Sequence, residues 1–219
     1  MHATPNAAPR PRAGAVDADE LFGTCNVMAI LRGYAPAEAT RLAHRAWDVG
    51  VDLVEVTVET PDALSTLAAV VAEGRDRGRR VGAGTVITVD QVHAVADLGA
   101  AFTVAPGLDA AVVASCRDHG LVHLPGVATS TEVQQSLGLG LRWLKAFPAS
   151  VLGVGWFVAM RGPFPHVRFV ATGGMDAANG RDFLAAGARV VAVGSALADP
   201  RQIEGLAEIL TDERPVPQR

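Results

Sequence analysis

The stretch 80-RVGAGTVITVDQVHAVADLGAAFTVAPG-107 decides the fold, because it holds one complete repeat of the pattern that fills the chain. An apolar run at 80–86 precedes Thr88, a residue type that caps helix N-termini. A segment with helical periodicity follows and ends at Gly99, and a second apolar run occupies 102–107. A strand, a helix and another strand in this order predict a βαβ unit with parallel strands.

The same pattern recurs on both sides of this stretch. The predicted strands lie at 26–32, 53–58, 80–86, 102–107, 121–127, 142–148, 167–174 and 190–195. The predicted helices begin near Pro36, Pro61, Thr88, Asp109, Ser130, Gly155, Asp176 and Pro200. Eight such units predict a single-domain α/β protein with a (β/α)8 TIM-barrel fold. A doubly wound open sheet is the alternative, but no Gly-x-Gly-x-x-Gly loop follows the first predicted strand.

Composition limits the partners and the setting. We expect the barrel to span residues 19–212, with flexible tails at 1–18 and 213–219, and no secretory signal in the first tail. The net charge is −4 and no apolar run reaches membrane-spanning length, which argues against nucleic-acid and membrane partners. The two cysteines form no CxxC motif and the six histidines show no metal-ligand spacing. We therefore expect a cytoplasmic protein without a metal.

Lys145 is the only lysine in the chain, whereas the other eighteen basic residues are arginines. It lies in the apolar stretch 141-LRWLKAFPAS-150, late in the sixth predicted strand. Burial in apolar surroundings would lower the pKa of this amine and free it to attack a carbonyl group. The product would be a Schiff base that assists cleavage or formation of a C–C bond. The alternative is a lysine at the end of a strand with no chemical role.

Glu55 is the second candidate catalytic residue. In 53-LVEVTV-58, alternation places Glu55 and Thr57 on one face and three valines on the other. The glutamate face is suited to the barrel interior, where a carboxylate near Lys145 could shuttle protons. The alternative is a structural carboxylate paired with Arg32 or Lys145.

Glycine pairs follow the last two predicted strands. Gly173 and Gly174 lie in 172-TGGMD-176, and Gly194 and Ser195 lie in 193-VGSAL-197. Loops at these positions of a (β/α)8 TIM barrel often bind phosphate through backbone N–H groups. The alternative is tight turns that require glycine. The glycines of 82-GAGT-85 would leave room inside the barrel, and Thr85 would offer a hydroxyl group at the rim. The alternative is a set of small residues that only fill a layer of the barrel.

The chain resembles the class I 2-keto-3-deoxy-6-phosphogluconate aldolases, also called 4-hydroxy-2-oxoglutarate aldolases. The resemblance extends from about Val27 to Ala198 and rests on the order and spacing of several motifs. These motifs are 28-MAILRG-33, 55-EVTVETP-61, 82-GAGTV-86, 105-APGL-108, 125-PG-126, 144-LKAFPA-149, 162-GPFPHVRFVATGG-174 and 193-VGSAL-197.

The resemblance implies a role for each matching residue. Lys145 matches the Schiff-base lysine, and Glu55 matches a general acid/base that works through a water molecule. The residues that match the keto-acid pocket are Thr85, Pro106, Phe147 and Thr172. The residues that match the phosphate site are Gly173, Gly174, Gly194 and Ser195. The resemblance also implies a homotrimer without metal or organic cofactor. The implied reaction cleaves 2-keto-3-deoxy-6-phosphogluconate to pyruvate and glyceraldehyde 3-phosphate.

Two positions depart from the family pattern. Many members carry an arginine that contacts the pyruvate carboxylate where this chain has Glu59. Other members lack it but carry an arginine in an Ile-Leu-Arg-Gly stretch on the first strand, which Arg32 matches, so the resemblance assigns that contact to Arg32. Ser150 replaces a glutamate of many members and is more similar to the 2-keto-3-deoxy-6-phosphogalactonate aldolases. Both departures leave open which substrate is used: the gluconate epimer, the galactonate epimer or 4-hydroxy-2-oxoglutarate.

Two further functions are compatible with the residues. A phosphate-binding isomerase or epimerase would use Glu55 as its base and Lys145 only for its charge. A non-catalytic barrel would bind a sugar phosphate, with Glu59 spoiling the catalytic pocket.

Overall fold

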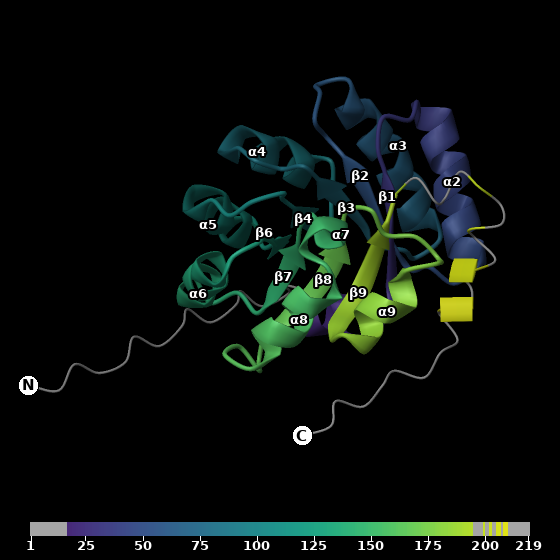
Figure 1. The fold of residues 1–219 in the computed structure, drawn as a ribbon. Helices are drawn as coiled ribbons and strands as arrows, with labels where there is room; N and C mark the ends of the chain where they lie inside the picture. The colour runs from purple at the N-terminus through teal and green to yellow at the C-terminus, as the bar shows by residue number, and fades with distance from the viewer. Residues whose placement is uncertain (1–16, 195–198, 200–201, 203–204, 207, 210–219) are drawn as a thin grey trace, which may run out of the picture.

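The computed structural model describes residues 17–194, together with residues 199, 202, 205, 206, 208 and 209. In this part of the chain, parallel strands form one sheet with helices on its outside (Figure 1). The strands are β1 (Val27–Leu31), β2 (Leu53–Thr57), β3 (Val81–Gly84), β4 (Phe102–Val104), β5 (Val122–Leu124), β6 (Gly126–Val127), β7 (Trp143–Ala146), β8 (Arg168–Thr172) and β9 (Ala188–Val193). The helices are α1 (Ala18–Phe22), α2 (Pro36–Asp48), α3 (Ala63–Asp76), α4 (Val89–Asp97), α5 (Ala110–Asp118), α6 (Ser130–Gly138), α7 (Ala149–Leu152), α8 (Val154–Arg161) and α9 (Gly180–Ala185).

The sheet closes on itself at Pro125. The strand order is β5-β4-β3-β2-β1-β9-β8-β7-β6, and its two ends are halves of one predicted strand, 121–127. β5 pairs with β4, whereas β6 pairs with β7. Proline has no N–H to donate, so it interrupts the strand, but its carbonyl oxygen still accepts from the Lys145 N–H at 2.8 Å. The predicted (β/α)8 barrel is therefore confirmed, and the open doubly wound sheet is excluded.

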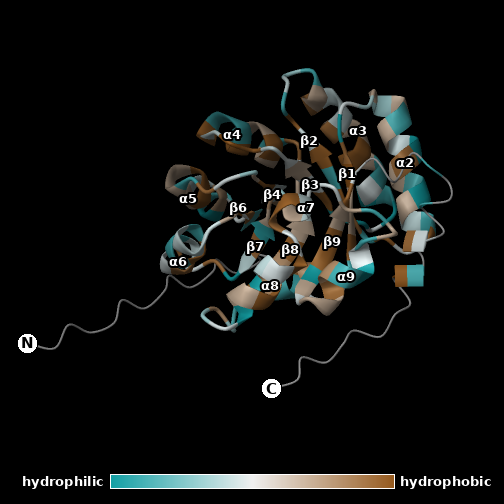
Figure 2. Ribbon diagram, in the orientation of Figure 1, coloured by the Kyte–Doolittle hydropathy of each residue, from teal (hydrophilic) through white to brown (hydrophobic). Residues whose placement is uncertain are grey.

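Two hydrophobic clusters follow from the alternation of side chains along the strands. On β2, Val54 and Val56 pack outward against the helices, whereas Leu53 packs inside the barrel. The outer cluster lies between the strands and the helices. The inner cluster lies inside the barrel and includes Met28 and Phe102. In Figure 2 the central strands are largely brown, whereas the helices around them mix brown and teal.

The short helix α1 closes the amino end of the barrel. Phe22 packs edge-on against Phe102, with ring centroids 5.5 Å apart, and lies 5.3 Å from the Trp143 ring. The Trp143 Nε1–H donates to the Asp19 carboxylate, which also pairs with Arg168. Because this end is closed, a substrate can enter only from the carboxyl ends of the strands, where barrel chemistry usually lies.

Several predicted boundaries differ from those observed. The helix predicted near Gly155 is two helices, α7 and α8, because Gly153 adopts a positive φ of 73° between them. The segments predicted near Pro61 and Asp176 become helical only at Ala63 and Gly180. The expected tails lie outside the described residues at 1–16 and 213–219. So does the start of the helix predicted near Pro200, although the described residues from 202 to 209 are helical.

No described helix combines the length and apolar character needed to cross a membrane.

Candidate active site

Lys145 lies inside the barrel on β7. Lys145 is 3% exposed. Trp143, two positions earlier on the same face of β7, belongs to the inner cluster. The Nζ atom lies 5.0 Å from the centroid of the Phe147 ring. Burial lowers the pKa of the Lys145 ammonium, the negative charge of Glu55 opposes this shift, and the positive charge of Arg32 adds to it. The amine is therefore easier to deprotonate than a surface lysine.

Glu55 lies inside the barrel on β2 and is completely buried. Neither carboxylate oxygen has a hydrogen-bond partner among the described residues. Burial raises the pKa of this carboxyl group, and the charges of Lys145 and Arg32 oppose the shift. A buried acid whose oxygens are not held by the protein can exchange protons with a bound molecule.

The space for Glu55 comes from glycine on the neighbouring strand. β2 pairs with β3 so that Thr57 lies beside Gly84 and Glu55 beside Gly82. A Cβ atom on Gly84 would collide with Oε1, Cδ and Cγ of Glu55, and one on Gly82 would collide with the Phe102 ring. The two glycines of β3 therefore leave room for two buried side chains: Gly84 for the Glu55 carboxylate and Gly82 for the Phe102 ring.

Arg32 lies at the carboxyl rim, directly after β1. Its Nη2 donates to Oγ1 of Thr85 at 3.3 Å, and its Nη1 lies 3.8 Å from Oε1 of Glu59. Thr85 has a φ of 61°, a left-handed conformation that is rare for a β-branched residue. Residues that follow three strands, β1, β2 and β3, thus meet at one guanidinium group. Glu59 is directed towards Arg32 and not only towards solvent.

The other predicted pocket residues follow β4, β7 and β8. Thr172 ends β8, is 3% exposed, and its Oγ1 has no partner among the described residues. Phe147 follows β7 and lies against Gly173, where an added Cβ would be 3.1 Å from its ring. Pro106 is exposed on the rim after β4, and its carbonyl lies so close to Gly126 that a Cβ there would collide with it. Phe147 thus lies beside Lys145, Thr172 ends the neighbouring strand β8, and Pro106 is exposed at the rim.

The predicted phosphate-binding glycines lie at the same rim. Gly173 and Gly174 have positive φ angles of 95° and 73°, so the loop after β8 needs glycine at both positions. The Ser150 N–H donates to the Gly173 carbonyl at 3.0 Å, and the Ser150 hydroxyl lies against Gly174. Gly194 lies near Ile30 of β1, whereas Ser195 lies outside the described residues.

Sequence reasoning missed two features of this site: the room that Gly84 leaves for Glu55, and the pairing of Glu59 with Arg32. The glycine spacing on β3 was a signal for the first, but the strand register was needed to read it. Among the described residues, no group of three or more His, Cys, Asp or Glu side chains could hold a metal ion.

Comparison with known proteins identifies the family. The family model described as KDPG and KHG aldolase matches residues 18–210. The chain belongs to this aldolase family. It is therefore a carbon–carbon lyase of the class I, Schiff-base type, and it releases pyruvate and an aldehyde from a 2-keto acid of the KDPG, KDPGal and KHG group. KDPG is 2-keto-3-deoxy-6-phosphogluconate, KDPGal is its galactonate epimer, and KHG is 4-hydroxy-2-oxoglutarate.

Two curated relatives of the KDPG and KHG aldolase family carry different substrate names. A probable 2-dehydro-3-deoxy-6-phosphogalactonate aldolase of Rhizobium meliloti (strain 1021) is 35% identical, over 82% of this chain and 84% of the relative. A 2-dehydro-3-deoxy-phosphogluconate aldolase of Treponema pallidum (strain Nichols) is 38% identical, over 75% of this chain and 78% of the relative. Similarity to these relatives therefore does not separate the two epimers.

One similar solved structure carries a covalent intermediate. It is the KDPG aldolase of Legionella pneumophila, with pyruvate captured at low pH as a covalent carbinolamine intermediate. Its sequence is 29% identical, and the match covers 89% of this chain and 97% of that chain with a TM-score of 0.78.

Proposed function

We propose that Lys145 is the nucleophile and Glu55 the general acid/base of this aldolase, acting on a 2-keto-3-deoxy-6-phospho sugar acid. The observation that carries this assignment is the sole lysine of the chain, buried in the barrel with a lowered pKa and in the electrostatic field of Glu55. An amine in this state attacks carbonyl groups, whereas a surface ammonium does not.

The first part of the reaction forms the imine. The neutral Nζ of Lys145 attacks C2 of the keto acid, and a proton moves from this nitrogen to the carbonyl oxygen to give a neutral carbinolamine. Loss of water from C2 then gives the protonated imine. Glu55, through a water molecule, supplies the proton that the departing hydroxyl needs. Its raised pKa keeps a proton available at pH values where an exposed carboxyl group has lost it.

The second part breaks the C–C bond. Deprotonated Glu55 accepts, through the same water, the proton of the C4 hydroxyl group. The electrons of the C3–C4 bond move to C3 and into the iminium nitrogen, so that the aldehyde leaves and an enamine remains. Glu55 then returns a proton to C3, and water at C2 releases pyruvate and restores the Lys145 amine.

The rim residues would supply groups for the two ends of such a substrate. Arg32 would bind the keto-acid carboxylate. The side chains of Thr85, Pro106, Phe147 and Thr172 would line the pocket. The loops with Gly173, Gly174, Gly194 and Ser195 would bind the phosphate through backbone N–H groups and a hydroxyl group. No metal or organic cofactor takes part in this scheme.

The substrate epimer and the assembly are part of the proposal. We expect the phosphorylated gluconate or galactonate acid to be cleaved faster than 4-hydroxy-2-oxoglutarate, since the latter has a carboxylate at C5 and no phosphate for the loops to bind. Steady-state rates with the three substrates side by side test this expectation. We also expect a homotrimer that works in the cytoplasm, and light scattering after gel filtration tests the trimer.

Trapping of the imine tests the chemistry directly. The protein is incubated with pyruvate, reduced with borohydride and weighed by mass spectrometry. We expect one pyruvate adduct on the wild type and none on Lys145→Ala or Lys145→Arg, because a guanidinium group cannot form the imine. Peptide mapping separates Lys145 from the terminal amine. An unmodified wild type, or an adduct that persists in Lys145→Ala, would overturn the proposal.

A further inference from the structure

The rim contact between Arg32 and Glu59 has no role in the scheme above. Arg32 is anchored at two points, since one terminal nitrogen donates to Thr85 and the other pairs with Glu59. The Arg32 side chain is 55% exposed and the Glu59 side chain 31% exposed. Without these anchors, an arginine at an open rim would sample many rotamers, and binding an anion would have to restrict them.

The anchors leave most of the guanidinium free for a ligand. This group carries five N–H donors in a planar arrangement. Thr85 and Glu59 each engage one terminal nitrogen, so at least half of the donors remain available. The positive charge is also close enough to shift the titration of both Glu55 and Lys145. The anchored group therefore faces the barrel mouth and not only the solvent.

Thr85 supports the same interpretation from the other side. Its φ of 61° is costly for a threonine, and such strain is usually retained only where the surrounding structure requires it. The hydroxyl group that accepts from Arg32 belongs to this strained residue. The geometry of the rim is thus fixed at the Thr85 end by the backbone and at the Glu59 end by charge.

We infer that Glu59 is a positioning residue, which together with Thr85 holds the Arg32 guanidinium across the mouth so that it binds the carboxylate of the keto acid. The inference rests on the proposed function, because it takes the substrate to be a keto acid bound at Lys145. It gives an acidic residue a favourable role beside an anionic substrate. The opposing view, that Glu59 only repels the substrate, predicts effects of opposite sign.

Pyruvate trapping separates the two views. The rate of borohydride trapping is measured against pyruvate concentration for the wild type, Glu59→Ala, Glu59→Asp and Glu59→Gln. We expect Glu59→Ala to raise the half-saturating pyruvate concentration by about three- to fivefold, as for loss of an exposed ion pair, with a smaller change in the limiting rate. Glu59→Asp should recover part of the loss, and Glu59→Gln less of it.

The Arg32→Ala background provides the decisive comparison. There Glu59→Ala should no longer raise the half-saturating concentration, because no guanidinium remains to be held. Glu38→Ala is the matched control, since Glu38 pairs with Arg41 on the surface of α2 and should have no effect. A lower half-saturating concentration in Glu59→Ala, or an equal rise in both backgrounds, overturns the inference. If the wild type forms no adduct, the proposed function fails and this inference fails with it.

Discussion

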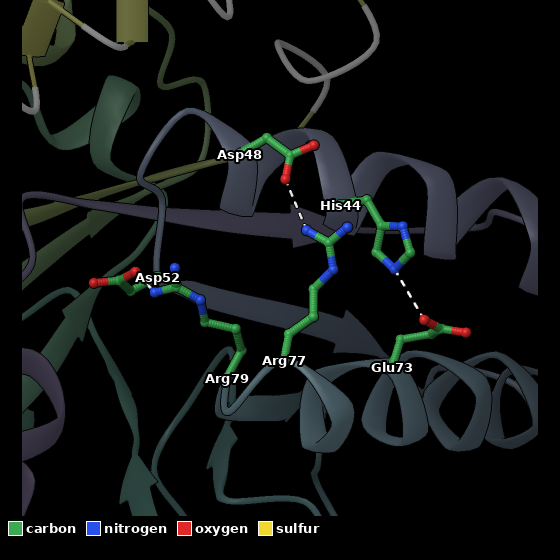
Figure 3. A network of polar contacts seen from close by, with 6 residues as sticks. All are labelled: His44, Asp48, Asp52, Glu73, Arg77 and Arg79. Atoms are coloured by element: carbon green, nitrogen blue, oxygen red, sulfur yellow. Dashed lines mark hydrogen bonds and ion pairs between the residues drawn. The ribbon is translucent and has the colours of Figure 1, made fainter.

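The outer face of α2 and α3 and the interior of the barrel treat charge in opposite ways. On the outside, each drawn acid has a basic partner: Asp48 with Arg77 and Glu73 with His44 at α2 and α3, and Asp52 with Arg79 in the loops before β2 and β3 (Figure 3). Inside the barrel, Glu55 has no hydrogen-bond partner in the described structure, and Lys145 is buried with its Nζ 5.0 Å from the Phe147 ring centroid. The outer pairs stay hydrated, so forming them requires little desolvation and contributes little stability. The inner charges are buried, and their desolvation is unfavourable.

The contrast indicates that the barrel interior holds charged groups at a cost in folding stability, because catalysis needs them there. The outer pairs satisfy one another and contribute little. The inner pair perturb each other's titration, which is the property that a proton-transfer site needs. Substitutions in the two regions should therefore change different quantities, and four predictions test this contrast.

The largest effect is expected from removing both inner charges. The double variant Lys145→Met/Glu55→Met should have no aldolase activity. It should also raise the free energy of unfolding by about 1–4 kcal/mol, as for other buried charges replaced by apolar groups of similar volume. Urea denaturation and a cleavage assay measure the two quantities. A less stable double variant would mean that the charges hold the barrel together, and the contrast would then be wrong.

Removing the space for Glu55 should give the next largest effect. In Gly84→Ala the new methyl group meets the end of the Glu55 side chain, so the carboxylate must move while the backbone can stay. We expect kcat to fall about a hundredfold, the loss typical of a displaced catalytic group. Gly84→Ala/Glu55→Asp should recover part of it. Gly155→Ala on α8, where nothing lies within 4 Å, is the control and should keep full activity; an active Gly84→Ala would contradict the role of this glycine.

A buried histidine should control stability in acid. His123 is 5% exposed on the outer face of β5, and its Nδ1 lies 2.8 Å from the Thr103 hydroxyl group. Burial lowers the pKa of His123 from 6.5 to about 4. Between these values the unfolded chain binds more protons, so stability is lost as the pH falls from about 6.5 towards 4.

The expected loss from His123 is about 2–3 kcal/mol at pH 4.5 relative to pH 7. Urea denaturation at both pH values should show that His123→Gln removes this part of the difference. His44→Gln, which removes a half-buried imidazole from α2, is the matched control. An equal pH dependence in the wild type and His123→Gln would show that His123 is not the titrating group.

The smallest effect is expected on the outer face. Asp48→Asn removes a charge from an exposed pair, so the free energy of unfolding should fall by less than about 1 kcal/mol. Because salt screens such pairs, the difference should vanish in about 1 M salt. The kcat and KM values should match those of the wild type. A larger loss, or one that persists in salt, would mean that the outer network is coupled to the barrel.

Much of the fold and the central chemistry could be predicted from the sequence. The barrel follows from the repeated strand–helix pattern, and Glu55 points inward because β2 alternates strictly. Lys145 was found by composition alone, since a single lysine in an apolar strand is conspicuous. These features depend on short segments, and local periodicity determines them.

The rest depends on which strands lie side by side. Gly84 makes room for Glu55 only because β2 and β3 pair in one register. Arg32 and Glu59 follow different strands and meet only at the closed rim. The sequence shows Pro125, but it does not show that the strand changes its pairing partner there, from β4 to β7. Helix α1 has five residues, too few for a periodic pattern, and only its packing on Phe102 and Trp143 gives it a place.

The single lysine also makes the chain its own probe of unfolding. A lysine-specific endoprotease has one bond to cut in all 219 residues, between Lys145 and Ala146. That bond lies in β7, between β6 and β8, where a protease cannot reach it. Cutting requires the barrel to open, so the cleavage rate reports the opened population without interference from mobile surface loops. Arginine-specific cleavage, with seventeen Arg–X bonds along the chain, would sample those loops instead. The ratio of the two rates would separate local motion from opening of the whole barrel.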